Sequence, residues 1–365
     1  MRVLHVIARM NVGGTATYLA NLIHGLEKLG VNNLLVMGNV PRGESEDAVV
    51  EKLKFHRVET LSRELNIRLD RKARAEIEKQ IREFKPDIIH THTFKAGFLV
   101  RLGRRATPVI HSFHGHHLYD PEFGFVKRTV LNFLERRLAD RSDALVTIGK
   151  QVRDELLEVG IGNTNQFFPI APGIDLLELK DEASIRAKFS FDTNEVLVVW
   201  LGRFTEVKRP DRVIEIARKN PDLTFVMAGG GELLDSLKST APCNVRFLGF
   251  QDKNEMWSIA DVALCTSDSE GMPLALIEAQ MAGVPVVSTD VGSVAEIVHD
   301  GVTGRLGTRS AADLAEKLRW VIAEIGKSDA LSKASREHAE REFSSEVMAK
   351  AHKDLYQRVL DKVAR

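Results

Sequence analysis

The sequence predicts an α/β protein made of two doubly wound domains in tandem. Short apolar segments alternate with amphipathic ones along its 365 residues, which is the pattern of parallel sheets covered by helices on both faces. The alternation is interrupted near 169–175 and then starts again. A chain of this length also suits two domains of ordinary size.

The first half opens with a strand at 3–8, a loop that holds Gly13 and Gly14, and a helix that runs to Leu29. Gly30 is a suitable C-terminal stop for that helix. Further strands are expected at 33–37, 87–90, 108–111 and 144–148. Residues 169–175 contain two prolines and a glycine, and we interpret them as an interdomain linker.

The second half repeats the pattern. A strongly apolar strand at 195–202 precedes a loop and a helix at 210–219. More strands are expected at 223–228, 245–247, 262–265 and 284–288. Helices dominate after Ser310, and the last of them, at 345–363, has no strand after it. In such folds ligands bind at the carboxyl ends of the strands.

Composition excludes several classes of protein. With 44% hydrophobic and 28% charged residues the chain is typical of a soluble globular protein, and a net charge of +0 argues against a nucleic-acid partner. Cys243 and Cys265 have no metal-binding or disulfide spacing, which favours a reducing compartment and a buried, inert Cys265. The chain begins at once with a strand and has no apolar run of membrane-span length. We therefore expect no signal peptide and a cytoplasmic location.

Residues 270–281 carry the strongest chemical signal. Glu270 and Glu278 flank a turn and a helix start, directly after the apolar run at 262–265. Gly271 permits close approach of the backbone, and Pro273 suits the first helical position. Free amides at a helix N-terminus bind anions, and Glu278 can lean back toward that end. An anion site beside two carboxylates suits a ligand that is both phosphate and polyol, such as a nucleotide sugar.

A second polar loop is expected at the same sheet edge. Gly202 and Arg203 end the strand at 195–202, and Lys208 follows before the helix at 210–219. Arg can grip diphosphate oxygens bidentately, while Lys acts as a mobile point charge. Taken alone, this pair is better explained as a solvated basic loop. Combined with the Glu270–Glu278 element, a diphosphate site becomes the stronger interpretation.

The remaining glycine-rich turns and histidines give weaker evidence for a binding site. The turn 228–232 lacks the spacing of a nicotinamide site, so a tight turn is at least as good an explanation as phosphate contact. Gly13 and Gly14 would line the binding site, where the lack of side chains lets their backbone come close to a ligand.

The histidines between residues 90 and 117 are crowded, but no acidic or cysteine cluster completes a metal site around them, so we expect no bound metal. The crowded histidines are His90, His92, His111, His114, His116 and His117.

Among these, His114, just past the strand at 108–111, is the best candidate to donate a hydrogen bond to a sugar hydroxyl or phosphate. His90 and His92 also lie at a strand end and would shape the acceptor side.

Taken together, five motifs of this sequence resemble a retaining glycosyltransferase of family 4 with the GT-B fold. The motifs are Gly202-Arg203…Lys208, Glu270-x7-Glu278, Gly13-Gly14, His114-Gly115 and Pro172-Gly173-Ile174-Asp175.

The resemblance runs from Val3 to about Gly307 and is strongest over 200–306. It implies two Rossmann-like domains that face each other across a cleft. Residues 1–172 would bind the acceptor and would be completed by a return helix at about 346–365, and 173–345 would bind the nucleotide-sugar donor. Ser293-Val294-Ala295 departs from the more usual Gly-Ile-Pro, which cautions against copying a donor preference.

The resemblance also implies roles at matching positions. Arg203 and Lys208 would hold the donor diphosphate, and Glu278 the ribose. Glu270 would bind a hydroxyl of the transferred sugar, with His114 near the same sugar. These catalytic groups are Arg203, Lys208, His114 and Glu270. The other donor-binding residues would be Gly13, Gly14, Gly202, Phe250, Gly271, Met272, Pro273, Leu274 and Glu278. Phe250 would lie by the base.

The implied reaction is hexosyl transfer with retention, from a UDP-sugar or, next, GDP-mannose to a hydroxyl of a glycan, lipid-linked or small-molecule acceptor. Front-face attack without a metal or other cofactor is expected. Two alternatives remain open, a sugar-nucleotide epimerase of the same architecture and a non-catalytic nucleotide-sugar-binding protein.

Residues 94–141 contain more Lys and Arg than Asp and Glu, interspersed with Phe113, Phe123, Phe125 and Phe133. Such a surface could rest on an anionic bilayer at the inner face of the cell membrane. Solvated helix faces with core aromatics explain the same pattern equally well.

Overall fold

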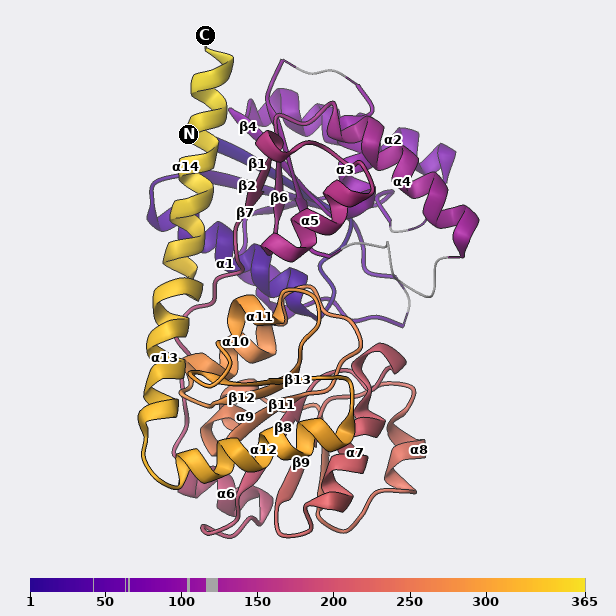
Figure 1. Ribbon diagram of the computed structural model, residues 1–365. Coiled ribbons are helices and arrows are strands. Elements are labelled where there is room, and N and C mark those ends of the chain that lie inside the picture. The colour runs from indigo at the N-terminus through magenta and orange to yellow at the C-terminus, as the bar shows by residue number, and fades with distance from the viewer. Residues whose placement is uncertain (42, 63, 65, 104–105, 116–123, 365) are drawn as a thin grey trace. The chain divides into compact units, whose positions relative to one another are not determined.

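The computed structural model describes residues 1–41, 43–62, 64, 66–103, 106–115 and 124–364, with no side-chain description at 125–127. His116, His117, Phe123 and the side chain of Phe125 therefore lie outside the described residues. The chain divides into two compact units (Figure 1). The N-terminal unit comprises Met1–Asp175 and Ser345–Arg365, and the C-terminal unit comprises Leu176–Ser344.

A sheet of seven strands, in the order β3-β2-β1-β4-β5-β6-β7, forms the centre of the N-terminal unit, and every pairing in it is parallel. The order reverses between β1 and β4, so the loops after these two strands diverge and leave a crevice at the carboxyl edge. The strands are β1 Arg2–Ile7, β2 Asn32–Met37, β3 Phe55–Arg57, β4 Ile88–His92, β5 Val109–Phe113, β6 Ala144–Thr147 and β7 Phe167–Pro169.

Helices cover both faces of this sheet, and the final helix α14 packs along α1 (Figure 1). Gly25 permits this packing, because a Cβ at that position would lie 2.6 Å from the Cβ of Ala349. Buried Leu22 and Tyr356 belong to the same apolar cluster. The helices are α1 Gly14–Lys28, η1 Ala48–Lys52, α2 Ile67–Phe84, α3 Thr93–Arg101, α4 Phe125–Ala139, α5 Lys150–Glu158, η2 Thr164–Gln166 and α14 Ser345–Val363.

The segment 169–175 differs from the linker that its prolines suggest. Pro169 is the last residue of β7, and Ile174 is buried. The Ile174 carbonyl accepts a hydrogen bond from Ser345 N at 2.9 Å, and Gly173 N donates to Met348 Sδ at 3.0 Å. The segment is thus packed inside the N-terminal unit, because its apolar residues meet the start of α14. The division of the chain falls after Asp175.

The C-terminal unit is built on six parallel strands in the order β10-β9-β8-β11-β12-β13. The order reverses between β8 and β11, which again places a crevice at their carboxyl ends. The predicted α/β class with two parallel, doubly wound sheets is confirmed. The strands are β8 Leu197–Leu201, β9 Thr224–Ala228, β10 Val245–Gly249, β11 Val262–Cys265, β12 Val286–Thr289 and β13 Gly304–Gly307.

Buried Val199, Phe225 and Val287 illustrate the apolar character of this sheet, which Figure 1 shows between layers of helices. Its helices are α6 Glu182–Phe189, η3 Glu206–Lys208, α7 Pro210–Lys219, α8 Leu234–Lys238, α9 Lys253–Ile259, α10 Leu274–Met281, α11 Val294–Ile297, α12 Ala311–Ile325 and α13 Ala330–Phe343. Within the described part of the chain, no helix has both the length and the apolarity to cross a membrane. Of the aromatic residues considered for bilayer contact, Phe113 is buried and Phe133 is exposed.

Candidate functional site

An ion pair joins the two loops that diverge at the switch point of the C-terminal unit. Lys208, at the end of η3 after β8, places its Nζ 2.6 Å from Oε1 and 2.7 Å from Oε2 of Glu270, which follows β11. The Glu270 side chain is only 8% exposed. Ser267 donates a second hydrogen bond to Oε1 at 2.6 Å. A nearly buried carboxylate is therefore neutralised and hydrogen-bonded, as burial of a charge requires.

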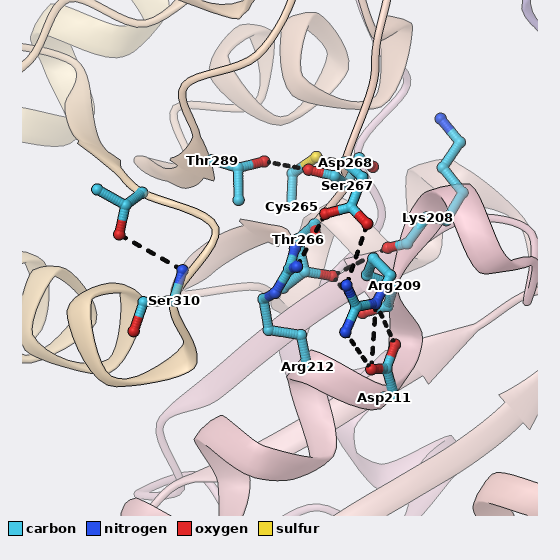
Figure 2. Close-up of polar contacts among 11 residues, drawn as sticks. Lys208, Arg209, Asp211, Arg212, Cys265, Thr266, Ser267, Asp268, Thr289 and Ser310 are labelled. Atoms are coloured by element: carbon cyan, nitrogen blue, oxygen red, sulfur yellow. Dashed lines mark hydrogen bonds and ion pairs between the residues drawn. The ribbon is translucent and has the colours of Figure 1, made fainter. Parts of the chain in front are cut away.

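Side chains under these loops fix the backbone that carries the pair, and Figure 2 shows this network. Thr266 Oγ1 donates to the carbonyls of Lys208 and Arg209, at 3.1 and 2.9 Å. Arg212 donates to the Thr266 carbonyl and, at 2.8 Å, to Asp268. Burial alone would raise the pKa of Asp268, but hydrogen bonds from Arg212 and Arg209 hold that pKa below its usual value. Asp268 is thus a stable anion that anchors both arginines.

Arg203 lies on the same edge as Lys208 but is not held in the same way. Its side chain is exposed, and it makes no hydrogen bond or ion pair with any residue that the structure describes. Its loop is closed from behind by the glycine turn after β9, where a Cβ on Gly229 would lie 1.9 Å from the Gly202 carbonyl oxygen. The tight turn expected at 228–232 thus has a packing role, and Arg203 is a guanidinium available to a ligand.

Helix α10 begins one residue later than its proline suggests. Pro273 is the N-cap, with an extended backbone at ψ 115°, and Leu274 is the first helical residue. The first amides of a helix have no acceptor within the helix, which here applies from Leu274 onward, although Leu276 N donates to the Pro273 carbonyl at 3.1 Å. Met272 has a buried side chain, so only its main chain can reach a ligand. The turn therefore presents backbone amides next to the Lys208–Glu270 pair.

Glu278 lies one turn along α10 from this helix start. Its side chain is 7% exposed, and Oε1 accepts from Lys253 Nζ at 2.6 Å. Sequence reasoning did not find Lys253, because nothing in the local pattern of α9 marks it as the partner of a residue on α10. Its distance to Oε1 makes it part of the candidate site.

The Glu270–Gly271 turn rests on a second loop, after β12. Ser293 N donates to the Gly271 carbonyl at 2.9 Å. Gly292 has φ 53°, and a Cβ at that position would lie 1.8 Å from the Glu270 carbonyl oxygen. Only glycine fits there without moving the turn. This residue also escaped the sequence analysis, because the turn that it supports is distant along the chain.

Phe250 and Cys265, for which predictions were also made from the sequence, differ in exposure. Phe250, after β10, is 79% exposed, and its ring lies against the backbone of Gly230. An exposed aromatic face of this kind can stack on a flat ligand. Cys265 is free and buried, and burial together with the nearby Glu270 raises its thiol pKa, so it is an inert core residue as expected.

The N-terminal unit gathers histidines at its own switch point. His5 on β1 lies beside His90 in the sheet register, and His5, His90 and His92 have ring nitrogens within 4.8 Å of one another. His92 Nδ1 and His114 Nε2 are 3.1 Å apart. Sequence spacing could not reveal His5, because parallel pairing across the sheet brings it into this group. Gly13, the N-cap of α1, and Gly14 are exposed at the end of the neighbouring loop.

His114 lines a cavity of about 310 Å³ within the same unit, together with Thr15, Ser112 and Phe113. Burial, reinforced by His352, lowers the pKa of His114 to about 3. Burial likewise lowers the pKa of His5 to about 3 and that of His92 well below its usual value. These three rings are therefore uncharged at neutral pH.

Comparison with known families decides where this architecture belongs. The sequence model for glycosyl transferases group 1 matches residues 181–338, and that for the glycosyl transferase 4-like domain matches residues 13–169. Between them the two models account for most of the chain. The chain belongs to the GT-B glycosyltransferases of family 4.

Curated relatives of this family-4 chain include the D-inositol 3-phosphate glycosyltransferase of Mycobacterium sp. (strain JLS). It is 29% identical over 251 residues, which are 60% of this chain and 55% of the relative. The protein of the same name from Rhodococcus jostii (strain RHA1) is 29% identical over 286 residues, covering 70% and 62% of the two chains. The alignments thus span less than two thirds of the length of these relatives.

Solved structures match over almost the whole family-4 chain. A sucrose-phosphate synthase from Thermosynechococcus elongatus superposes with a TM-score of 0.84 at 19% identity, covering 99% of this chain and 100% of the other. Anabaena HepE, solved in complex with UDP and glucose, gives a TM-score of 0.82 at 19% identity, with coverage of 98% and 100%. At such low identity the likeness concerns the fold.

Gly292→Ala tests whether the β12 loop supports the Glu270 turn. The new methyl group meets the Glu270 carbonyl, so we expect a loss of stability of about 3 kcal/mol or more, by overpacking in addition to backbone strain. Gly301→Ala is the matched control, since Gly301 has φ 77° with nothing within 4 Å of its Cβ position. That variant should lose only the strain of about 1–2 kcal/mol. Equal melting temperatures for the two variants would contradict the packing role of Gly292.

Proposed function

We propose that the chain is a retaining glycosyltransferase that moves a sugar from a nucleoside-diphosphate sugar to an acceptor hydroxyl. The observation that supports this most is the meeting of Lys208, Glu270 and the start of α10 at one sheet edge. The same edge carries the Arg203 guanidinium, which has no side-chain partner among the described residues. This edge offers positive charge and free amides for a diphosphate, and carboxylates for hydroxyls. Family membership points to the same class of reaction.

Arg203 and Lys208 are proposed to bind the diphosphate of the donor. The Arg203 guanidinium is available for bidentate contact, and Lys208 is 25% exposed, so its ammonium can reach a ligand while remaining near Glu270. Gly271 and Leu274 would add backbone amides from the turn and the first turn of α10. These fixed groups would neutralise the charge that develops on the leaving diphosphate. In this proposal no metal ion is required for that task.

Glu270 is proposed to bind the transferred sugar rather than to act as a nucleophile. Among the described residues, Oε1 already accepts from Lys208, Ser267 and, at 3.9 Å, Cys265 Sγ, whereas Oε2 accepts from Lys208 alone. One lone pair of Oε2 thus remains for a sugar hydroxyl. Because these side chains hold the carboxylate in place, attack on the anomeric carbon would have to break this network. We therefore favour front-face attack, in which the departing phosphate takes the acceptor proton.

Glu278 is proposed to bind the ribose of the donor. Lys253 holds Oε1, and Oε2 has no hydrogen-bond partner among the residues described. That oxygen can accept from a ribose hydroxyl. The exposed ring of Phe250 is proposed to lie by the base, and Gly202 to bind the donor through its main chain. Gly13 and Gly14 are proposed to contact a donor phosphate, and His114 the transferred sugar.

UDP is the proposed nucleotide and GDP the next choice. The HepE structures hold UDP, which favours this order. The relatives named for D-inositol 3-phosphate suggest that a small polyol phosphate belongs among the acceptors to be tried. The alternative epimerase would convert a UDP-sugar without any acceptor, so incubation of the donor alone separates the two reactions.

Lys208→Ala should lower turnover by roughly a hundredfold or more, because it removes a cation from the leaving diphosphate. The Thr266 hydroxyl still holds the main chain of residue 208, but Glu270 loses its charge partner, so we expect a lower melting temperature as well, with the fold retained. Nucleotide release from a UDP-sugar in the presence of acceptor measures the effect. Lys219→Ala, at the exposed end of α7, is the control and should keep full activity. Turnover close to normal in Lys208→Ala would remove the diphosphate assignment.

Glu278→Ala should chiefly weaken nucleotide binding. Loss of a hydrogen bond to a charged oxygen costs about 1.5–3 kcal/mol, which corresponds to roughly a 10- to 100-fold higher Kd. Lys253 is 38% exposed, so water can solvate its ammonium once the partner has gone. Calorimetry with UDP checks the expectation, and Glu215→Ala on the exposed side of α7 is the control. An unchanged Kd for Glu278→Ala would reject the ribose role.

A further inference from the structure

A chain of hydrogen bonds inside the N-terminal unit runs from Asn33 through two buried histidines to His114. His5 Nε2 is 3.2 Å from Asn33 Oδ1, and His5 Nδ1 is 3.2 Å from His92 Nε2. His92 Nδ1 is in turn 3.1 Å from His114 Nε2. Each neutral imidazole has one donor nitrogen and one acceptor nitrogen, so the whole chain has one direction once any single proton is placed.

Asn33 places that proton. Its Nδ2 lies 3.2 Å from the Val31 carbonyl and 3.4 Å from the Ile23 carbonyl, and both carbonyls can only accept. If the amide were reversed, its oxygen would face these two oxygens with no hydrogen between them. Asn33 Oδ1 must therefore face His5 and accept from it, which puts the His5 proton on Nε2.

The remaining protons follow in order. With its proton on Nε2, His5 accepts at Nδ1 from His92 Nε2. His92 then has a bare Nδ1 and accepts from His114 Nε2. His114 is left with a bare Nδ1, which has no hydrogen-bond partner among the described residues, while its side chain lines the cavity of about 310 Å³. All three rings are uncharged at neutral pH, since burial lowers the pKa of each.

We propose that Asn33, acting through His5 and His92, holds His114 in the form with a bare Nδ1, so that His114 accepts a hydrogen bond from a ligand hydroxyl. This reverses the donation to a sugar or phosphate that sequence reasoning expects. A bare nitrogen attracts a hydroxyl and repels an unprotonated phosphate oxygen. His114 thereby selects a sugar or acceptor hydroxyl at this point, which rests on the proposed glycosyl transfer. Asn33, His5 and His92 are positioning residues.

Nitrogen NMR of the ¹⁵N-histidine-labelled protein tests the tautomers without any need for activity, because protonated and bare ring nitrogens have well separated shifts. We expect His5, His92 and His114 each to carry a proton on Nε2 alone. A proton on Nδ1 of His114 would overturn the proposal. So would a bound ion between His5 and His92, which would leave both facing nitrogens bare and would appear in elemental analysis.

Asn33→Leu should release the constraint, so that His114 becomes a mixture of its two tautomers. Asn32→Leu, at the adjacent exposed position of β2, should leave the His114 signals unchanged. If Asn33→Leu does not fold, His5→Gln keeps both a donor and an acceptor and should retain the wild-type form of His114, whereas His5→Leu should not. A single unchanged tautomer in either leucine variant at Asn33 or His5 would show that the chain does not control His114.

UDP-glucose then tests the ligand contact in the wild-type protein. A hydroxyl that donates to Nδ1 should shift that bare nitrogen signal toward the protonated range. If calorimetry shows binding of UDP-glucose or of an acceptor and the signal does not move with either, the ligand part of the proposal is wrong. If neither ligand binds, the proposed function fails, while the tautomer result still decides the hydrogen-bond chain.

Discussion

The C-terminal unit depends on how one nearly buried carboxylate is kept charged. Glu270 follows an apolar strand and has only 8% of its side chain exposed, so its negative charge must be paired inside the protein. Lys208 pairs with it from the loop of the neighbouring strand, and Ser267 adds a hydrogen bond. The loops after β8 and β11 are thereby drawn together. The shape of the candidate site follows from this pairing.

Residues that do not touch Glu270 with their side chains hold the two loops that carry the Lys208–Glu270 pair. Thr266 holds the main chain on each side of the Lys208–Arg209 bond, and Asp268 holds Arg209 and Arg212. Gly292 lets another loop pass directly behind Glu270. Because these contacts satisfy the structural charges internally, Arg203 and the first turn of α10 are left for a ligand. A rigid support with a few uncommitted polar groups is what recognition of a charged substrate requires.

The fold was largely predictable because its strands and helices are strongly apolar or strongly amphipathic. The helix at Pro210–Lys219, the strand at Val262–Cys265 and the final helix at Ser345–Val363 occur at the predicted bounds. Strands β3, β7 and β13 lie at sheet edges and were missed, because three or four residues are too short to show a strand pattern. Residues 169–175 directly precede the division of the chain, but they pack within the N-terminal unit, because proline marks an extended backbone as readily as a domain boundary.

The candidate site was predictable only in part, for a related physical reason. Local motifs identified Lys208, Glu270 and Glu278 as site residues. Their internal partners are fixed by the arrangement of strands, and so neither Lys253 nor His5 could be recognised from sequence spacing. The direction of the His92–His114 hydrogen bond depends on carbonyls beside Asn33, far away in the sequence. Site residues that only the tertiary fold brings together can be identified from the structure but not from sequence spacing.

Recognition of a diphosphate at the edge around Lys208 and Arg203 can be measured by calorimetry of uridine, UMP and UDP at low salt. We expect affinity to rise with each phosphate, with UDP at least about tenfold tighter than uridine, a difference of about 1.4 kcal/mol. Added salt should weaken UDP binding more than uridine binding, because ions screen charge interactions. Equal affinities for uridine and UDP, or binding of UDP that does not respond to salt, would contradict diphosphate recognition at this edge.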